Sequence, residues 1–214
     1  MEPTAALREL VEPVTRADQQ VLPVLPELSA LLPGGALRRG STVVVMAGTS
    51  LGGTSLGGTS LGGTSLAMAL AAGPSASGSW CAAVGLPSLG LVATAEMGVA
   101  LERLALVRGP GRSWAAVVAA LVDAIDVVVI RPPGPVRPAD VRRLSARARE
   151  RGAVLVPLCS GWEGADVRLS VTGCEWEGLG AGHGHLRARR LEVLAQGRGA
   201  AARPRRACLW LPAS

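Results

Sequence analysis

The sequence contains no lysine, phenylalanine, tyrosine or asparagine, and all 22 of its basic residues are arginines. Without lysine the chain cannot form a Schiff base, use a lysine as general base, or hold nucleotide phosphates with the lysine of a P-loop. A GC-rich gene explains the missing residue types, and the chemical exclusion holds whatever their cause. Aromatic residues make up only 2% of the chain and all are tryptophans, so we expect a core of Leu, Val and Ala.

Length and composition are those of a globular protein. The 214 residues are 49% hydrophobic and 18% charged, which fits one domain with a small appendage. The longest apolar stretch, 115–130, holds two aspartates and is too short to span a bilayer, so we expect a cytoplasmic protein without membrane contact. The four cysteines form no C-x-x-C pair, and His183 and His185 have no carboxylate neighbour. We therefore expect reduced, buried thiols and no metal site.

Helix-like and strand-like segments alternate along most of the chain, which predicts an α/β fold with a largely parallel sheet. The expected strands are 41–47, 80–84, 104–107, 126–130 and 153–158. The expected helices are 4–18, 64–72 (stopped by Gly73-Pro74), 89–101, 114–124 (capped by Ser113) and 138–152.

The last third of the chain has a different pattern, because strand-like segments at 167–171, 186–195 and 207–211 follow one another without helices. These segments predict an antiparallel C-terminal extension of the sheet. We divide the chain into an N-terminal helix with a Pro-rich connector (1–33), a core (34–171) and an Arg-rich β extension (172–214).

A tandem repeat of the pentapeptide GTSLG follows the first core strand. It places the pattern G-x-x-x-x-G-T-S between a strand and a helix three times, with Thr54, Thr59 or Thr64 where the P-loop pattern has lysine. Backbone amides of such a loop can cradle phosphate, but the lysine charge is lost. The residues of this degenerate phosphate loop are Gly48, Gly53, Gly58, Gly63, Thr64 and Ser65.

The order of these motifs resembles RecA, the recombinase. The approach LPGG…LRRGS followed by VVVMAG, the strand WCAAV, the strand DVVVI at 126–130 and the late segment AARPRRACLWL carry the resemblance. It implies a RecA-like three-layer fold. Where the family has its catalytic Glu and its magnesium-binding Asp, this chain has Pro87 and Arg131. The family's sensing Gln and its two DNA-binding loops also lack counterparts, since the corresponding loops (132–135 and 160–164) are short.

A shortened RecA-like chain without these groups resembles the ImuA family, in particular its ImuA-prime type. The strings GVALERLALV, RARERGAVLVPL and GHGHLRARR are similar to that group. The resemblance implies a non-catalytic adaptor, a pseudo-ATPase without cofactor, in SOS translesion synthesis and mutagenesis. The implied partners are an ImuB-like polymerase relative, RecA and a second copy of the chain, and the implied location is the nucleoid during repair.

Two alternatives remain open at the level of sequence. An ATP-binding RecA-like recombinase or ATPase would need Arg131, Arg189 or Arg190 in place of the P-loop lysine. A cell-division inhibitor of the SulA type is the other, because SulA proteins resemble ImuA.

Two arginine clusters form a candidate surface for a protein partner or a polyanion. The alternative is an ordinary solvated helix surface on which arginine stands in for lysine. Without Phe or Tyr for base stacking we expect at most weak, salt-sensitive DNA contact. The residues are Arg142, Arg143, Arg147, Arg151, Arg187, Arg189, Arg190, Arg203, Arg205 and Arg206.

Overall fold

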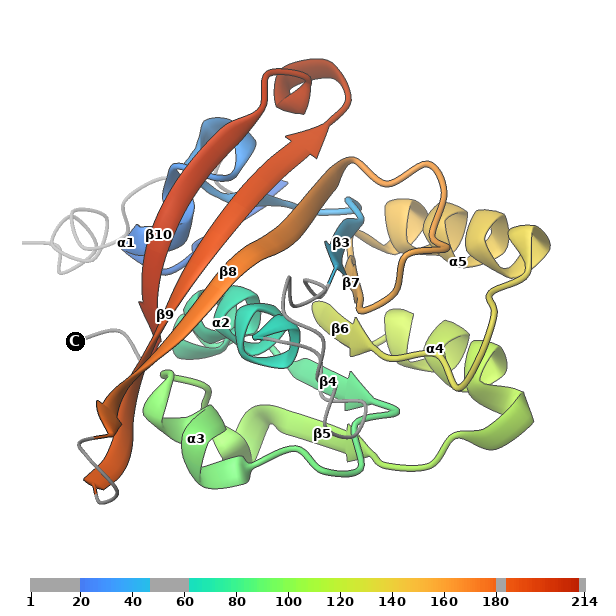
Figure 1. Ribbon diagram of the computed structural model, residues 1–214. Coiled ribbons are helices and arrows are strands. Elements are labelled where there is room, and N and C mark those ends of the chain that lie inside the picture. Colours follow the sequence, from blue (N-terminus) through green and yellow to red (C-terminus); the bar gives the residue numbers. More distant parts are fainter. Residues whose placement is uncertain (1–19, 47–61, 180–183, 212–214) are drawn as a thin grey trace, which may run out of the picture.

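The computed structural model describes residues 20–46, 62–179 and 184–211, with the side chains of 177–187 left out, and shows a mixed α/β fold (Figure 1). The helix expected over 4–18 lies outside these ranges. One parallel sheet has the strand order β5 (Leu104–Val107), β4 (Cys81–Val84), β6 (Val127–Ile130), β7 (Val154–Pro157).

A second sheet has the order β10 (Arg205–Leu211), β9 (Gly184–Gly197), β8 (Val167–Leu179), β3 (Val43–Met46). Strand β3 runs parallel to β8, whereas β9 pairs antiparallel with both β8 and β10. Isolated bridges from Thr42 to Leu155 and from Val45 to Leu158 connect β3 with β7, so the two sheets continue into each other. The predicted antiparallel C-terminal extension is confirmed by these pairings.

Helices lie on both faces of the parallel strands (Figure 1). On one face are α2 (Gly63–Ala76) and α3 (Leu91–Glu96), and on the other are α4 (Trp114–Val122) and α5 (Pro138–Arg151). Because side chains alternate along a strand, Val127 and Val129 join the core beside α2, while Val128 and Ile130 join the core beside α4 and α5. Continuous apolar runs in the sequence therefore mark strands buried on both faces.

The N-terminal part of the described chain adds a small layer beside α2. It consists of β1 (Val21–Leu22), α1 (Pro26–Ser29) and β2 (Leu37–Arg38), with β1 and β2 paired antiparallel. Leu28 and Leu37 are each only 1% exposed, so this layer contributes to the core. The sequence predicted only a loose connector here, because these elements are too short to show a periodicity.

Three predictions about helix ends are wrong. The helix expected over 89–101 is only Leu91–Glu96, and a 3-10 helix follows at Leu101–Arg103. Helix α2 does not stop at Gly73 but continues through Pro74 to Ala76. A Cβ on Gly73 would lie 2.7 Å from the Pro23 carbonyl oxygen, so the connector packs directly on this turn and tertiary contact holds the helix together. Ser113 precedes α4 but makes no side-chain capping hydrogen bond, because its φ of −86° and ψ of 9° are not those of an extended cap residue.

Two further expectations concern the burial of the cysteines and the absence of a membrane-spanning segment. Cys81 is buried and its pKa is raised to about 12, chiefly by desolvation, whereas Cys208 is exposed, contrary to the expectation of buried thiols. Among the described helices, none has the length and apolarity needed to cross a membrane.

Candidate functional site

The candidate site lies at the carboxyl end of β3, where α2 begins. In parallel sheets ligands bind at this edge, because the loops after the strands gather there. Gly63, Thr64 and Ser65 form the first turn of α2. Gly48, Gly53 and Gly58 lie outside the described residues, as do the other two copies of the repeat frame.

A glycine is required immediately before α2. Gly62 has a φ of +71°, and a Cβ placed on it would lie 2.4 Å from the Leu191 side chain. Only glycine tolerates both the left-handed backbone and this close approach. The contact also brings β9 against the start of α2, a proximity that sequence spacing did not predict.

Arg131 reaches the site from the end of β6. Its backbone amide donates to the Val84 carbonyl at 2.8 Å, which fixes the residue beside the end of β4. Its Nη2 donates to Thr64 Oγ1 at 2.7 Å. Burial lowers the pKa of the Arg131 guanidinium from its usual value, because desolvation disfavours the charged form. The contact joins two residues that are 67 positions apart in the sequence.

Arg189 reaches the same helix turn from β9. Its Nη1 donates to Ser65 Oγ at 3.1 Å, and its Cζ lies 3.8 Å from the centroid of the Trp176 ring. Burial lowers its pKa too, and its Nε is buried without a hydrogen-bond partner among the described residues. Trp176 was not among the predicted site residues, although its place opposite Arg189 on paired strands is what aligns the two side chains.

Arg190, the third candidate for the lysine's place, lies away from the site. Successive residues of a strand point to opposite faces, so Arg190 projects from the other face of β9. There it pairs with Glu175 at 3.2 Å. The structure therefore brings two of the three sequence candidates, Arg131 and Arg189, to the first turn of α2.

The site combines two arginine side chains with two neutral hydroxyls. Two guanidinium groups hold the hydroxyls of Thr64 and Ser65, and the helix N-terminus adds further partial positive charge. After β4 the sequence Gly85-Leu86-Pro87-Ser88 has no carboxylate, and Pro87 is exposed. The arrangement suits an anion, and residues 85–88 offer no carboxylate for Mg²⁺.

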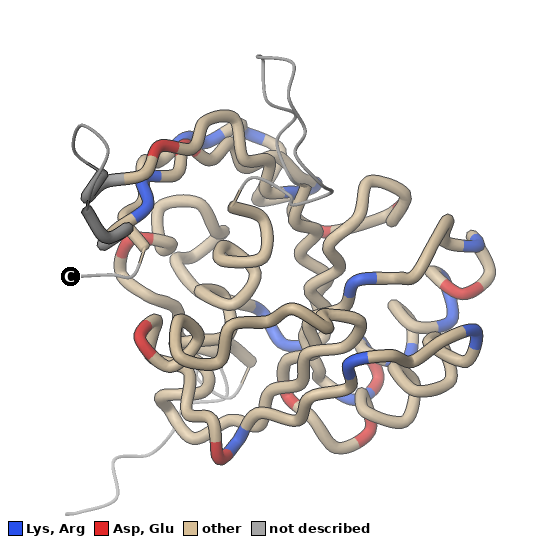
Figure 2. The backbone as a smooth tube through the Cα atoms, turned by 60° about the horizontal axis from the view of Figure 1, so that its bottom comes forward, with Lys and Arg blue, Asp and Glu red and all other residues tan. Residues whose placement is uncertain are grey.

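The arginines of α5 have a different setting. Arg147 and Arg151 both bind the carboxylate of Asp123 on the neighbouring helix end, and Arg143 bonds Asp140 at 3.0 Å within α5. These contacts lower the pKa of Asp123, with the hydrogen bond from Arg147 as the largest cause. Of the four predicted residues on this helix, Arg142 alone makes no ion pair with an acidic group of the described residues. Figure 2 shows acidic positions distributed among the basic ones.

The arginines of the C-terminal strands do not form one surface. Arg189 faces α2, Arg190 faces the opposite side, and Arg205 bonds the Ala200 carbonyl at 3.3 Å. Arg203 and Arg206 are exposed, and the side chain of Arg187 lies outside the described part. The second predicted cluster is thus divided between two faces of the sheet by strand alternation.

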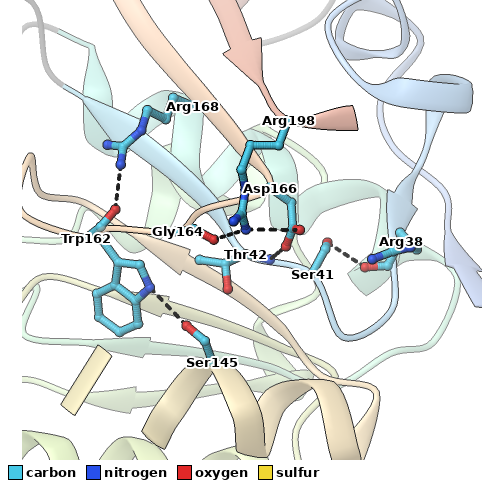
Figure 3. Close-up of polar contacts among 9 residues, drawn as sticks. All are labelled: Arg38, Ser41, Thr42, Ser145, Trp162, Gly164, Asp166, Arg168 and Arg198. Atoms are coloured by element: carbon cyan, nitrogen blue, oxygen red, sulfur yellow. Dashed lines mark hydrogen bonds and ion pairs between the residues drawn. The ribbon is translucent and has the colours of Figure 1, made fainter. Parts of the chain in front are cut away.

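The short segment 160–164 is held tightly to the core (Figure 3). Trp162 is fully buried, its Nε1 donates to Ser145 Oγ at 3.2 Å, and its carbonyl accepts from Arg168 at 2.8 Å. Arg198 binds the Gly164 carbonyl, and Asp166 accepts from the Thr42 amide at 2.9 Å. This segment serves as an anchor between β7 and β8.

Comparison with known proteins finds a relative of this chain. The chain is 36% identical over 137 residues to the uncharacterized protein Rv3395c of Mycobacterium tuberculosis strain H37Rv, a match that covers 60% of this chain and 67% of the relative.

A family description also covers much of the site. The model of the MT3502 N-terminal domain matches residues 30–164, a range that includes Thr64 and Arg131 but ends before Trp176 and Arg189. The contact between Arg131 and Thr64 thus lies inside the matched region, whereas Arg189 lies beyond it. Because the match spans more than half of the chain, this protein belongs to the MT3502 N-terminal domain family.

Proposed function

We propose that this chain is a non-catalytic RecA-like adaptor in DNA-damage-induced (SOS) translesion synthesis, which bridges RecA and an ImuB-type polymerase relative. The observation that carries the proposal is the hydrogen bond of 2.7 Å from Arg131 to Thr64. By the resemblance to RecA-like ATPases, the position of Arg131 would carry an acid and that of Thr64 a lysine. Here the pair is a cation and a neutral hydroxyl.

The contacts at the first turn of α2 support the absence of catalysis. Phosphoryl transfer needs a metal ion held by carboxylate and hydroxyl oxygens and a cation on the transferred phosphate. Thr64 and Ser65 instead accept hydrogen bonds from arginines. A guanidinium at the end of β6 repels Mg²⁺ where an aspartate would attract its hydration shell. An enzyme that lost both charges would lose several kcal/mol of transition-state stabilisation, on the order of a thousand-fold or more in rate.

The arrangement of strands supports the RecA-like part of the proposal. The repeat lies between β3 and α2 in the sequence. Arg131 follows β6, and β7 lies between β6 and β3. The sheet has helices on both faces, and its antiparallel strands β8 to β10 continue it on the far side of β3 (Figure 1). An adaptor needs a stable core and free surface, and this architecture supplies both without a chemical step.

A direct binding assay tests the adaptor role. Tagged full-length protein is incubated with purified RecA filaments on single-stranded DNA and, separately, with an ImuB-type protein from the same source. We expect both to be retained at moderate ionic strength. Two charge-reversal variants, Arg142→Glu and Arg147→Glu, are compared as a matched pair. Of the two residues, only Arg147 also stabilises the fold, through its bond to Asp123. Failure to bind either partner contradicts the proposal.

A second candidate function, nucleotide binding without the lysine, has one observation in its favour. Arg131 and Arg189 both lie at the first turn of α2 and together supply the charge that lysine would bring. Calorimetric titration with Mg·ATP separates the candidates. We expect no binding and no turnover for the natural chain, and recovery of binding in the double variant Thr64→Lys, Arg131→Asp. Stoichiometric binding with turnover by the natural chain would favour the ATPase.

A further inference from the structure

Strand β10 (Arg205–Leu211) forms the outer border of the antiparallel ribbon made by β8, β9 and β10 (Figure 1). One edge of β10 pairs with β9, and no other strand of the described residues pairs with its second edge, although helix α1 (Pro26–Ser29) packs against β10. An unpaired strand edge presents a row of amide and carbonyl groups that can bind another strand. Natural proteins usually cover or charge such an edge.

Prolines limit the part of the chain that can pair. Pro204 precedes β10 and Pro212 follows it in the sequence, and proline cannot donate to a ladder. Any added strand must therefore pair with the seven residues from Arg205 to Leu211. The centre of this segment is Cys208, whose side chain is exposed.

The two faces of β10 differ in kind. Leu209 and Leu211 are only 1% and 4% exposed and pack into the core, whereas Arg206, Cys208 and Trp210 point outward. Trp210 is 39% exposed, although a large apolar side chain is usually buried. The outward face thus carries a cation at one end, a thiol at the centre and an aromatic ring at the other end.

We propose that β10 pairs antiparallel with β10 of a second copy of this chain, in a two-fold symmetric register centred on Cys208. In that register Arg206 of each copy lies directly opposite Trp210 of the other, and the two Cys208 residues face each other. The two copies then form one continuous sheet. The proposal is independent of the SOS adaptor role.

Charge complementarity selects a second copy as the occupant. The centred register puts each guanidinium over an aromatic ring, a favourable cross-strand pair, and separates the two Arg206 side chains by four positions along the strand. Ala207 faces Leu209, and Arg205 faces Leu211, so no position meets a like charge. A seven-residue strand pair buries less area than a standard interface, so the association is weak and depends on protein concentration.

Sedimentation of the full chain over a range of concentrations, followed by oxidation with diamide, tests the proposal. Paired strands hold opposite Cα atoms about 4.5–5.5 Å apart, within disulfide range. We expect a concentration-dependent dimer that oxidation locks covalently. Cys208→Ser abolishes the covalent dimer, and Cys174→Ser, which changes a half-buried thiol on the inward face, leaves it intact.

Charge variants at an exposed position distinguish this register from other contacts. Trp210→Arg places like charges opposite each other twice per dimer and weakens association by at least about ten-fold, whereas Trp210→Glu retains it. The double variant Arg206→Glu, Trp210→Arg restores association, because the opposite charges are exchanged. A chain that stays monomeric overturns the proposal. The proposal is also overturned by a dimer whose association is unchanged by substitutions at position 210 and that does not cross-link through Cys208, since the interface is then elsewhere.

Discussion

The arginines at the start of α2 and those on α5 are the same residue type in opposite settings. Arg131 and Arg189 are half-buried, bond neutral hydroxyls and have pKa values lowered by desolvation. Arg147 is more exposed and bonds a carboxylate that raises its pKa. The first pair bonds the hydroxyls of Thr64 and Ser65, whereas Arg147 is held in an ion pair with Asp123. A count of arginines in the sequence does not separate the two.

The largest effect should come from disturbing the backbone that positions Arg131. Gly85 has a φ of +74°, and a Cβ on it would lie 2.1 Å from the Arg131 carbonyl oxygen. We expect Gly85→Ala to lower the free energy of unfolding by about 3 kcal/mol, measured by urea denaturation. Gly134→Ala is the control, because nothing lies within 4 Å of its added Cβ. Equal losses in both variants would show that the ends of β4 and β6 are not packed as described.

A smaller effect should follow from removing the ring beneath Arg189. Trp176→Leu deletes the stacking partner whose centroid lies 3.8 Å from the guanidinium carbon, and should cost about 1 kcal/mol of unfolding free energy. The matched control is Trp80→Leu, because Trp80 is exposed to a similar extent, 49% against 47% for Trp176. If the control loses as much stability, the stacking contributes nothing beyond its apolar area.

Acidification should affect the α5 pairs before the α2 site. Because the folded-state pKa of Asp123 is lowered, its contribution to stability is present above the unfolded pKa of aspartate and is lost as pH falls through the folded value. The Asp123→Asn variant should therefore lose less stability than the natural chain between neutral and strongly acidic pH. Unfolding curves taken at successive pH values measure the difference, and identical pH profiles would argue against the ion pairs with Arg147 and Arg151.

The smallest effect should be that of Arg142, which is exposed on α5. We expect Arg142→Gln to change the unfolding free energy by less than about 0.5 kcal/mol, as is typical of surface positions without specific contacts. Its partner in the comparison is Arg147→Gln, which should be destabilising and sensitive to salt because it leaves Asp123 without its main ligand. Thermal unfolding at low and high ionic strength tests both, and a salt-sensitive loss at Arg142 would reveal a further ion pair.

Local patterns predicted the secondary structure well where the signal was strong. The strand expected at 104–107 has those bounds in the structure, and Pro138 opens α5 while Gly152, with a φ of +72°, ends it. Predictions failed where packing overrides local preference, as at Pro74, where the connector stabilises the last turn of α2. Segments α1, β1 and β2 were missed because their few residues carry too little pattern.

The sequence by itself determined which residue types this protein lacks and the order of its longer strands and helices. Three observations can be read directly from the sequence: the absence of lysine, the threonines in the repeat and the arginine after the strand at 126–130. Only the tertiary structure decided which groups meet. Arg131 and Thr64 are 67 residues apart and Arg189 and Ser65 are 124 apart, and their contacts depend on strands from distant segments ending beside one helix. Alternation along β9 then assigns Arg189 to that helix and Arg190 to the opposite face, because adjacent residues of a strand cannot point the same way.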